Sequence, residues 1–117
     1  MFDSAQASAT IYPDRAIADV ISLVAREKNV PRRLLTHPSR CRATASQARH
    51  LAMYLSYVVL GRTLAEIGEQ FGRDRTTVSY ACAHIEDMRD DPAFDAEVSR
   101  LEAWLEAASG ASHHVAA

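Results

Sequence analysis

The segment Asp74-Arg75-Thr76-Thr77 combines an acid, a guanidinium and two hydroxyls at the start of a predicted helix. An arginine can donate two hydrogen bonds to the edge of a guanine, and a threonine offers both a methyl group and a hydroxyl. The free N–H groups of a helix N-terminus attract phosphate. Asp74 fits this segment either as the helix N-cap or as an acceptor for a cytosine amine. This chemistry is suited to the major groove of duplex DNA.

A turn precedes this segment and separates two predicted helices. Thr63 and Glu66 match a capping box, which starts a short helix that runs to about Phe71. Gly72 ends that helix, because a helix C-terminus commonly needs a left-handed residue. The next helix covers about 74–89, and its outward side near the N-terminus presents Arg75, Thr76, Ser79 and Tyr80. The pattern predicts a helix-turn-helix whose second helix is the recognition helix.

Helical spacing of apolar residues predicts further helices around this hairpin. The first covers about 14–28 and ends before Pro31, and a short turn follows over 32–35. We expect a loop over 37–45, a second long helix over 46–60, and a last helix that starts with Pro92. The residues expected to pack inward are Ile17, Val20, Ile21, Val24, Leu34, Leu35, Leu51, Ala52, Tyr54, Leu55, Val58, Val59, Leu64, Ile67, Phe71, Val78, Ala81, Cys82, Ile85, Met88, Phe94, Val98, Leu101, Trp104 and Leu105.

The fold class that these elements predict is all-α, a small helical bundle that contains a helix-turn-helix, as in Trp repressor. No segment shows the alternating pattern of a strand. The length of 117 residues leaves room for one domain. We place this domain over 13–107 and expect disordered tails over 1–12 and 108–117.

The charges are distributed unevenly along the chain, although the net charge is only −2. Residues 26–75 carry ten Arg or Lys against four Asp or Glu, which gives +6. Residues 76–117 carry two against eight, which gives −6, and residues 1–25 carry one against three, which gives −2. A basic middle favours a polyanionic partner on one face, whereas the alternative is that these charges only solvate the surface.

Catalytic, cofactor and metal signatures are absent from the sequence, so we predict no enzyme, no cofactor and no metal site. Cys41 and Cys82 lack the spacing of a zinc site, and the adjacent pair His113-His114 has no further ligands nearby. There is neither a phosphate-binding Gly-rich loop nor a nucleophile elbow, so no bound nucleotide is expected. No apolar run is long enough for a membrane span and no signal peptide begins the chain, so we expect a cytoplasmic, nucleoid-associated protein with no membrane partner.

The central run of the chain resembles a known family. Leu64-Ala65-Glu66-Ile67-Gly68-Glu69-Gln70-Phe71-Gly72-Arg73-Asp74-Arg75-Thr76-Thr77-Val78, followed by Tyr80-Ala81-Cys82-Ala83-His84-Ile85, is similar to the signature of the C-terminal DNA-binding domain of the bacterial replication initiator DnaA. The run Arg49-His50-Leu51-Ala52-Met53-Tyr54-Leu55 looks like the helix before the family's hairpin. The resemblance covers about 14–107.

The resemblance implies roles for individual residues. Asp74, Arg75, Thr76 and Thr77 would contact bases in the major groove, with Thr77 also near a phosphate. Arg40 or Arg42, from the basic loop, would enter the minor groove. Tyr80 either contacts the DNA backbone or packs on the rim of the hairpin. The residues assigned to phosphate are Arg49, Thr63, Arg73, Ser79 and Tyr80.

The chain also departs from the family pattern. One glycine, Gly72, stands where the family usually has two, which predicts a shorter turn. Arg75 replaces a base-reading histidine, so the preferred DNA box is expected to differ. Cys41 falls where the loop arginine is usual. Tyr57, Ala83 and His84 replace residues that are often basic, which predicts fewer phosphate contacts and a shallower dependence of binding on salt.

The family implies a function for the chain as a free-standing domain, since the initiator's ATPase module has no counterpart in this sequence. We expect sequence-specific binding of double-stranded DNA at initiator-type boxes, which regulates the initiation of chromosomal replication. The same sequence is compatible with two alternative functions. One is a transcription regulator at promoters, and the other is a protein-interaction adaptor that binds the full-length initiator through its acidic last helix.

Overall fold

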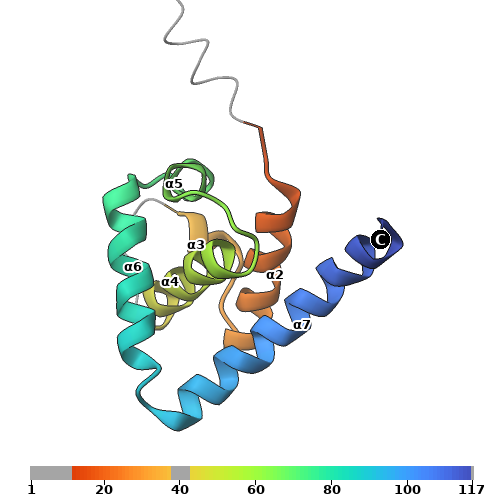
Figure 1. Ribbon diagram of the computed structural model, residues 1–117. Helices are drawn as coiled ribbons and strands as arrows, with labels where there is room; N and C mark the ends of the chain where they lie inside the picture. The colour runs from red at the N-terminus through yellow and green to blue at the C-terminus, as the bar shows by residue number, and fades with distance from the viewer. Residues whose placement is uncertain (1–11, 38–42, 117) are drawn as a thin grey trace, which may run out of the picture.

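The computed structural model describes residues 12–37 and 43–116, and side chains up to residue 108. The described residues form six helices and no strand, which confirms the predicted all-α class (Figure 1). The helices are α2 (Arg15–Lys28), α3 (Arg33–Thr36), α4 (Ala43–Val58), α5 (Leu64–Phe71), α6 (Arg75–Met88) and α7 (Pro92–Ala116).

Capping residues set most of the helix boundaries. Asp14 caps α2 by accepting hydrogen bonds from the backbone N–H groups of Ala16 and Ile17. Asn29 ends α2 in the left-handed conformation, with φ of 56°. Each of these contacts joins residues close in sequence and satisfies backbone groups that a helix end leaves free. The sequence predicted nearly the same bounds from apolar spacing and from Pro31.

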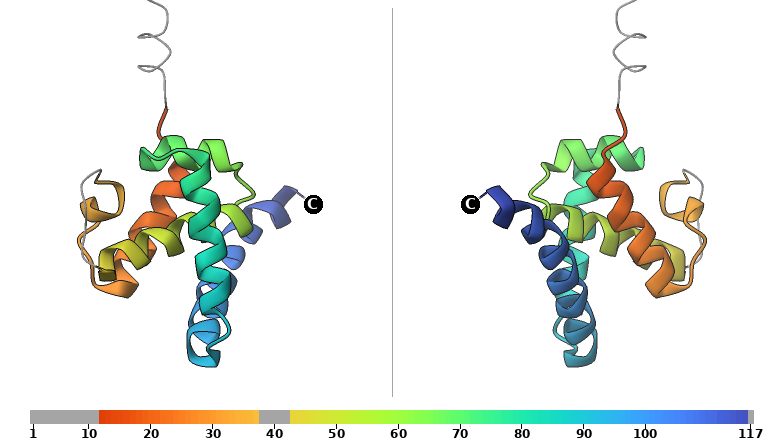
Figure 2. Two further views of the ribbon diagram at one scale, coloured as in Figure 1. Left: turned by 90° about the vertical axis from the view of Figure 1, so that its left-hand side faces the viewer. Right: turned by 90° about the vertical axis from the view of Figure 1, so that its right-hand side faces the viewer.

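The central helix α4 differs from its prediction. It begins at Ala43, three residues before the expected start, and Ala45 is 2% exposed against the other helices. It ends at Val58, which is 41% exposed and does not face the core as expected. All residues from Leu51 to Ser56 are buried. The prediction assigned α4 one inward side, but α2, α3, α5 and α6 pack around it, so its middle is buried on every side (Figure 2).

One hydrophobic core joins the helices. Most of the apolar residues that the sequence placed inside are buried, including Tyr54, while Val59, Leu64, Cys82 and Met88 pack partly buried at its edge. The side chains under 2% exposed with the largest volumes are Phe71, Ile17, Leu35, Leu51, Met53, Leu55, Ile67, Ile85, Leu101, Val20, Val24 and Val78. Trp104 is an exception at 54% exposed, so its predicted place in the core is wrong.

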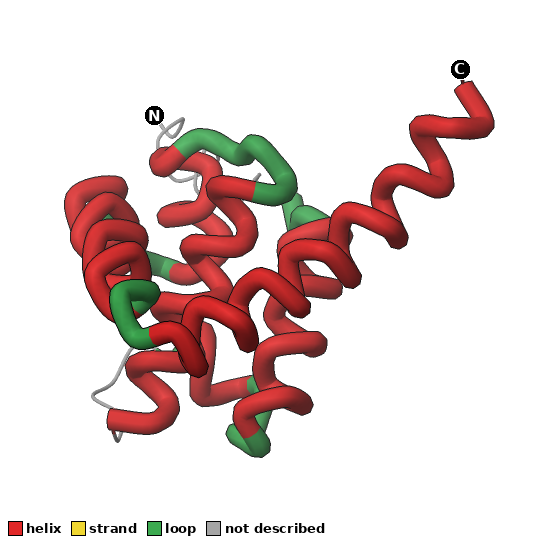
Figure 3. Tube along the Cα trace, turned by 60° about the horizontal axis from the view of Figure 1, so that its bottom comes forward, coloured by secondary structure: helices red, strands yellow, loops and turns green. Residues whose placement is uncertain are grey.

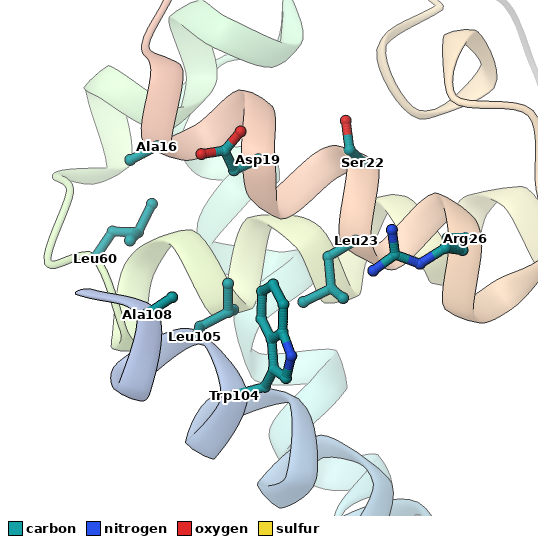
Figure 4. Close-up of a pocket in the computed structure, with 9 residues that line it drawn as sticks. All are labelled: Ala16, Asp19, Ser22, Leu23, Arg26, Leu60, Trp104, Leu105 and Ala108. Carbon is teal, nitrogen blue, oxygen red and sulfur yellow. The ribbon is translucent and has the colours of Figure 1, made fainter. Parts of the chain in front are cut away.

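Helix α7 crosses the bundle and extends beyond it (Figure 3). Phe94, Val98, Leu101 and Leu105 bury one stripe of this helix. Beside it lies a pocket of about 410 Å³ against α2, and Trp104 lines this pocket (Figure 4). None of the residues assigned to DNA from the sequence lines the pocket. The expected boundary at residue 107 falls within α7, and residues 1–11 of the expected N-terminal tail lie outside the described residues.

Ion pairs between helices neutralise part of the uneven charge that the sequence shows. Arg89, at the end of α6, binds Asp95 and Glu102 on α7 and donates a hydrogen bond to the Tyr54 hydroxyl at 3.0 Å. Lys28 on α2 pairs with Glu97 on α7 at 2.9 Å. The acidic last helix is therefore partly neutralised within the molecule, where it is held against the bundle.

Asp14 provides a prediction about acid stability. Its carboxylate pairs with Arg62 at 2.7 Å, and this hydrogen bond, followed by that from the Ile17 N–H, lowers the pKa of Asp14 despite partial burial. Because the pKa of Asp14 is lower in the folded state, its ionised carboxylate stabilises the fold. This stabilisation is fully present above the unfolded-state pKa and is lost as pH falls through the folded-state pKa. Asp14→Asn keeps a capping oxygen but removes the charge.

We therefore expect Asp14→Asn to cost less than about 1 kcal/mol at neutral pH and to flatten the acid dependence of the free energy of unfolding. Urea unfolding between about pH 2 and pH 7 measures both effects. Asp19→Asn, which removes an exposed carboxylate on the same helix, is the matched control. An unchanged acid dependence in Asp14→Asn would contradict the assignment.

Candidate nucleic-acid interface

The turn between α5 and α6 is closed by hydrogen bonds and a tight backbone contact. Thr63 and Glu66 form the predicted capping box at the start of α5. Gly72 ends α5 with φ of 67°, and the Arg73 N–H donates to the Gly68 carbonyl at 2.9 Å. A Cβ at Gly68 would overlap the Arg73 carbonyl oxygen, so this position needs glycine for space rather than for its backbone angles. The short turn 72–74 therefore sets the approach of the two helices.

Helix α6 has one buried and one exposed side. Val78, Ala81 and Ile85 are fully buried against the core. On the opposite side Arg75, Thr76 and Ser79 are exposed, Tyr80 is 65% exposed, and Thr77 is half-buried. The left view of Figure 2 looks onto α6, which runs along the outside of the bundle. The predicted amphipathic helix is confirmed, and its polar N-terminal residues are open to a ligand.

Asp74 is the N-cap of α6. Its carboxylate accepts a hydrogen bond from the Thr77 N–H at 2.8 Å. Contacts with the backbone and side chain of Thr77 lower the pKa of Asp74, so the carboxylate remains charged near neutral pH. Asp74 makes this capping bond while it remains exposed at the surface, beside Arg75 and Thr76. The capping alternative is confirmed, and the contact with a cytosine amine stays a prediction.

Arg73 connects the turn to the segment before the basic loop. Its guanidinium donates to the His37 carbonyl at 3.0 Å and to the Phe71 carbonyl at 3.2 Å. This hydrogen bond places His37, which immediately precedes residues 38–42, next to the start of α6. Arg40 and Arg42 belong to that segment and lie outside the described residues.

Arg49 has a structural contact that sequence reasoning missed. It is 7% exposed, and its guanidinium donates to the carbonyls of Leu34 and Leu35, both at 3.0 Å. These bonds satisfy the C-terminal end of the short helix α3, whose carbonyls have no partner within the helix. No local pattern indicates the contact, since it joins residues 14 and 15 positions apart. The phosphate contact assigned to Arg49 from the sequence stays a prediction.

Three rings meet where the exposed side of α6 borders α4. Tyr80 stacks on His84 with their planes at 14° and their centroids 6.1 Å apart. The His50 ring from α4 meets the Tyr80 and His84 rings edge-on. Tyr80 therefore packs on the rim of the hairpin and is also largely exposed. Sequence reasoning missed this cluster, because His50 and His84 lie 34 positions apart.

Other chemistry has little support in the described part of the chain. No group of three or more His, Cys, Asp or Glu side chains there is arranged to hold a metal ion. Cys82 is half-buried, and burial, followed by the charge of Glu86, raises the pKa of its thiol to about 11, which disfavours the reactive thiolate. None of the described helices is both long enough and apolar enough to cross a membrane.

Comparison with known proteins places the chain in a family. The model of the bacterial dnaA protein helix-turn-helix matches residues 17–85, more than half of the chain. The chromosomal replication initiator protein DnaA of Symbiobacterium thermophilum is 39% identical over 78% of this chain, and that of Mesorhizobium japonicum is 47% identical over 62%. The chain spans only 20% and 15% of the lengths of these relatives. The helix-turn-helix of this chain is intact, and the chain belongs to the DnaA helix-turn-helix family. This is a family of DNA-binding domains associated with replication initiation.

Proposed function

We propose that this chain binds double-stranded DNA sequence-specifically, with the N-terminal end of α6 in the major groove. The observation that carries the proposal is the polar N-terminal edge 74–77 of α6. The closed turn of a DnaA helix-turn-helix presents this edge on a helix whose other side is buried in the core. A helix presented in this way fits the width of the major groove, where each base pair shows a distinct pattern of donors and acceptors.

The residues of this edge have different proposed roles. Arg75 donates to a guanine, and Thr76 contacts a thymine methyl group or a neighbouring base. Thr77 is half-buried, which favours a contact with the phosphate through the helix N-terminus. Asp74 holds the first turn and faces a cytosine amine. Arg40 and Arg42 enter the adjacent minor groove, and the phosphate contacts come from Arg49, Thr63, Arg73, Ser79 and Tyr80.

The proposed targets are initiator-type boxes, and the proposed role is regulation of the initiation of chromosomal replication. Both relatives named above are chromosomal replication initiator proteins, and the family match covers α5, the turn and α6 up to Ile85. If this chain occupies the same boxes, it competes with the full-length initiator for them. The full-length initiator is also the proposed protein partner at these sites.

Binding to selected duplexes tests the proposal. A box is first defined by enrichment from a random duplex library, and its affinity is then compared with that of a scrambled duplex of the same composition. We expect at least about tenfold tighter binding to the box, because each mismatched pair typically costs about 1–3 kcal/mol. Affinity should also fall with salt as phosphate contacts release counterions.

Two outcomes contradict the proposal. One is a library that yields no enriched sequence, and the other is equal binding to box and scrambled duplex at physiological salt. Genome-wide occupancy then separates origin boxes from promoters as the sites of action, because the protein–DNA contacts are the same at both.

A further inference from the structure

His50 on α4 and His84 on α6 meet at an unusually short distance for two basic side chains. Their Nδ1 atoms lie 3.0 Å apart, within hydrogen-bond distance. Both side chains are partly buried, and their rings stand at 85° to each other. A hydrogen bond between two Nδ1 atoms needs one donor and one acceptor, so at least one ring directs a lone pair at the other.

If both rings turn slightly from this hydrogen bond, their Nδ1 lone pairs converge on one point beside the pair, where two imidazoles can share a metal ion. Imidazole nitrogens bind divalent transition metals at about 2.0–2.1 Å. Two such bonds to atoms 3.0 Å apart enclose roughly 95° at the metal, an angle typical of neighbouring positions in octahedral or tetragonal coordination. A tetrahedral ion needs the two nitrogens only a few tenths of an ångström further apart.

We propose that His50 and His84 form a site for a divalent transition metal of the Ni²⁺, Cu²⁺ or Zn²⁺ class, which bridges α4 and α6 through both Nδ1 atoms. Each ring then carries its proton on Nε2, so the shared proton of the hydrogen-bonded pair moves from Nδ1 to Nε2 and no net proton is lost from a neutral pair. The described residues offer no third His, Cys, Asp or Glu at this point, so water completes the coordination.

The packing of α6 against α4 holds the two rings next to each other. Tyr80 stacks on the ring of His84. Because α6 also carries residues 74–80, a bound ion would fix the proposed recognition helix against the central helix of the bundle.

Metal titration tests the site in a suitable background. The variant His113→Gln/His114→Gln removes the adjacent tail histidines, which could bind Ni²⁺ themselves. Into this background we introduce His50→Gln or His84→Gln, with His37→Gln as the matched control, since His37 lies outside the ring cluster. The readouts are calorimetric titration with NiCl₂ and the melting temperature with and without the ion.

We expect Ni²⁺ to raise the melting temperature of the background protein, because the ion binds the folded state. Either His50→Gln or His84→Gln should reduce the affinity at least about tenfold, as loss of one of two ligands predicts, while His37→Gln leaves it unchanged. In the background protein itself, ¹H–¹⁵N spectra of the imidazoles under ZnCl₂ titration should shift Nδ1 of both residues. Unshifted Nδ1 signals, or an affinity that neither substitution changes, would overturn the proposal.

Discussion

Gly68→Ala is expected to destabilise the domain by about 3 kcal/mol. The added Cβ would overlap the Arg73 carbonyl oxygen, which is backbone and cannot rotate away. The Arg73 N–H is itself bonded to the Gly68 carbonyl at 2.9 Å, so relief of the overlap has to move α5 and the turn apart. Urea unfolding gives the change in free energy.

Gly72→Ala is the matched control for this effect. Gly72 has φ of 67°, and a Cβ there meets no atom within 4 Å. Its cost therefore comes from backbone strain alone, at about 1 kcal/mol. If Gly68→Ala costs no more than Gly72→Ala, the close approach at Gly68 does not limit the packing of the hairpin.

Arg75→Ala is expected to weaken binding to the selected box by about 1–3 kcal/mol, which is roughly 5- to 150-fold, and to relax the preference at one base pair. Arg75 is exposed, and no hydrogen bond or ion pair holds it within the described residues, so its removal should leave stability nearly unchanged. Fluorescence anisotropy with the box and with its single-base variants measures affinity and preference together.

Arg100→Ala separates base reading from simple loss of charge. It removes the same charge from α7, where Arg100 is 59% exposed and pairs with Glu27. A small, sequence-independent loss is expected for this control. If Arg75→Ala behaves like Arg100→Ala on every duplex, Arg75 does not read a base.

The boundaries of α2, α5 and α6 were predictable because their causes are local. Asp14, Thr63 with Glu66, and Asp74 each bond to backbone groups two or three positions away, and Gly72 ends α5 by a conformation of its own. Apolar spacing likewise predicted the buried side of α6, since that helix contacts the core on one side only. The candidate recognition edge follows from these local signals together.

Tertiary structure decided the features that join distant segments. The bonds of Arg49 to α3, the contacts of Arg89 with α4 and α7, and the ring pair of His50 and His84 depend on how helices pack. The exposure of Val58 and Trp104 has the same origin, because an apolar residue is buried only where another element covers it. Sequence periodicity describes the faces of a single helix, whereas these contacts depend on the neighbours that surround it.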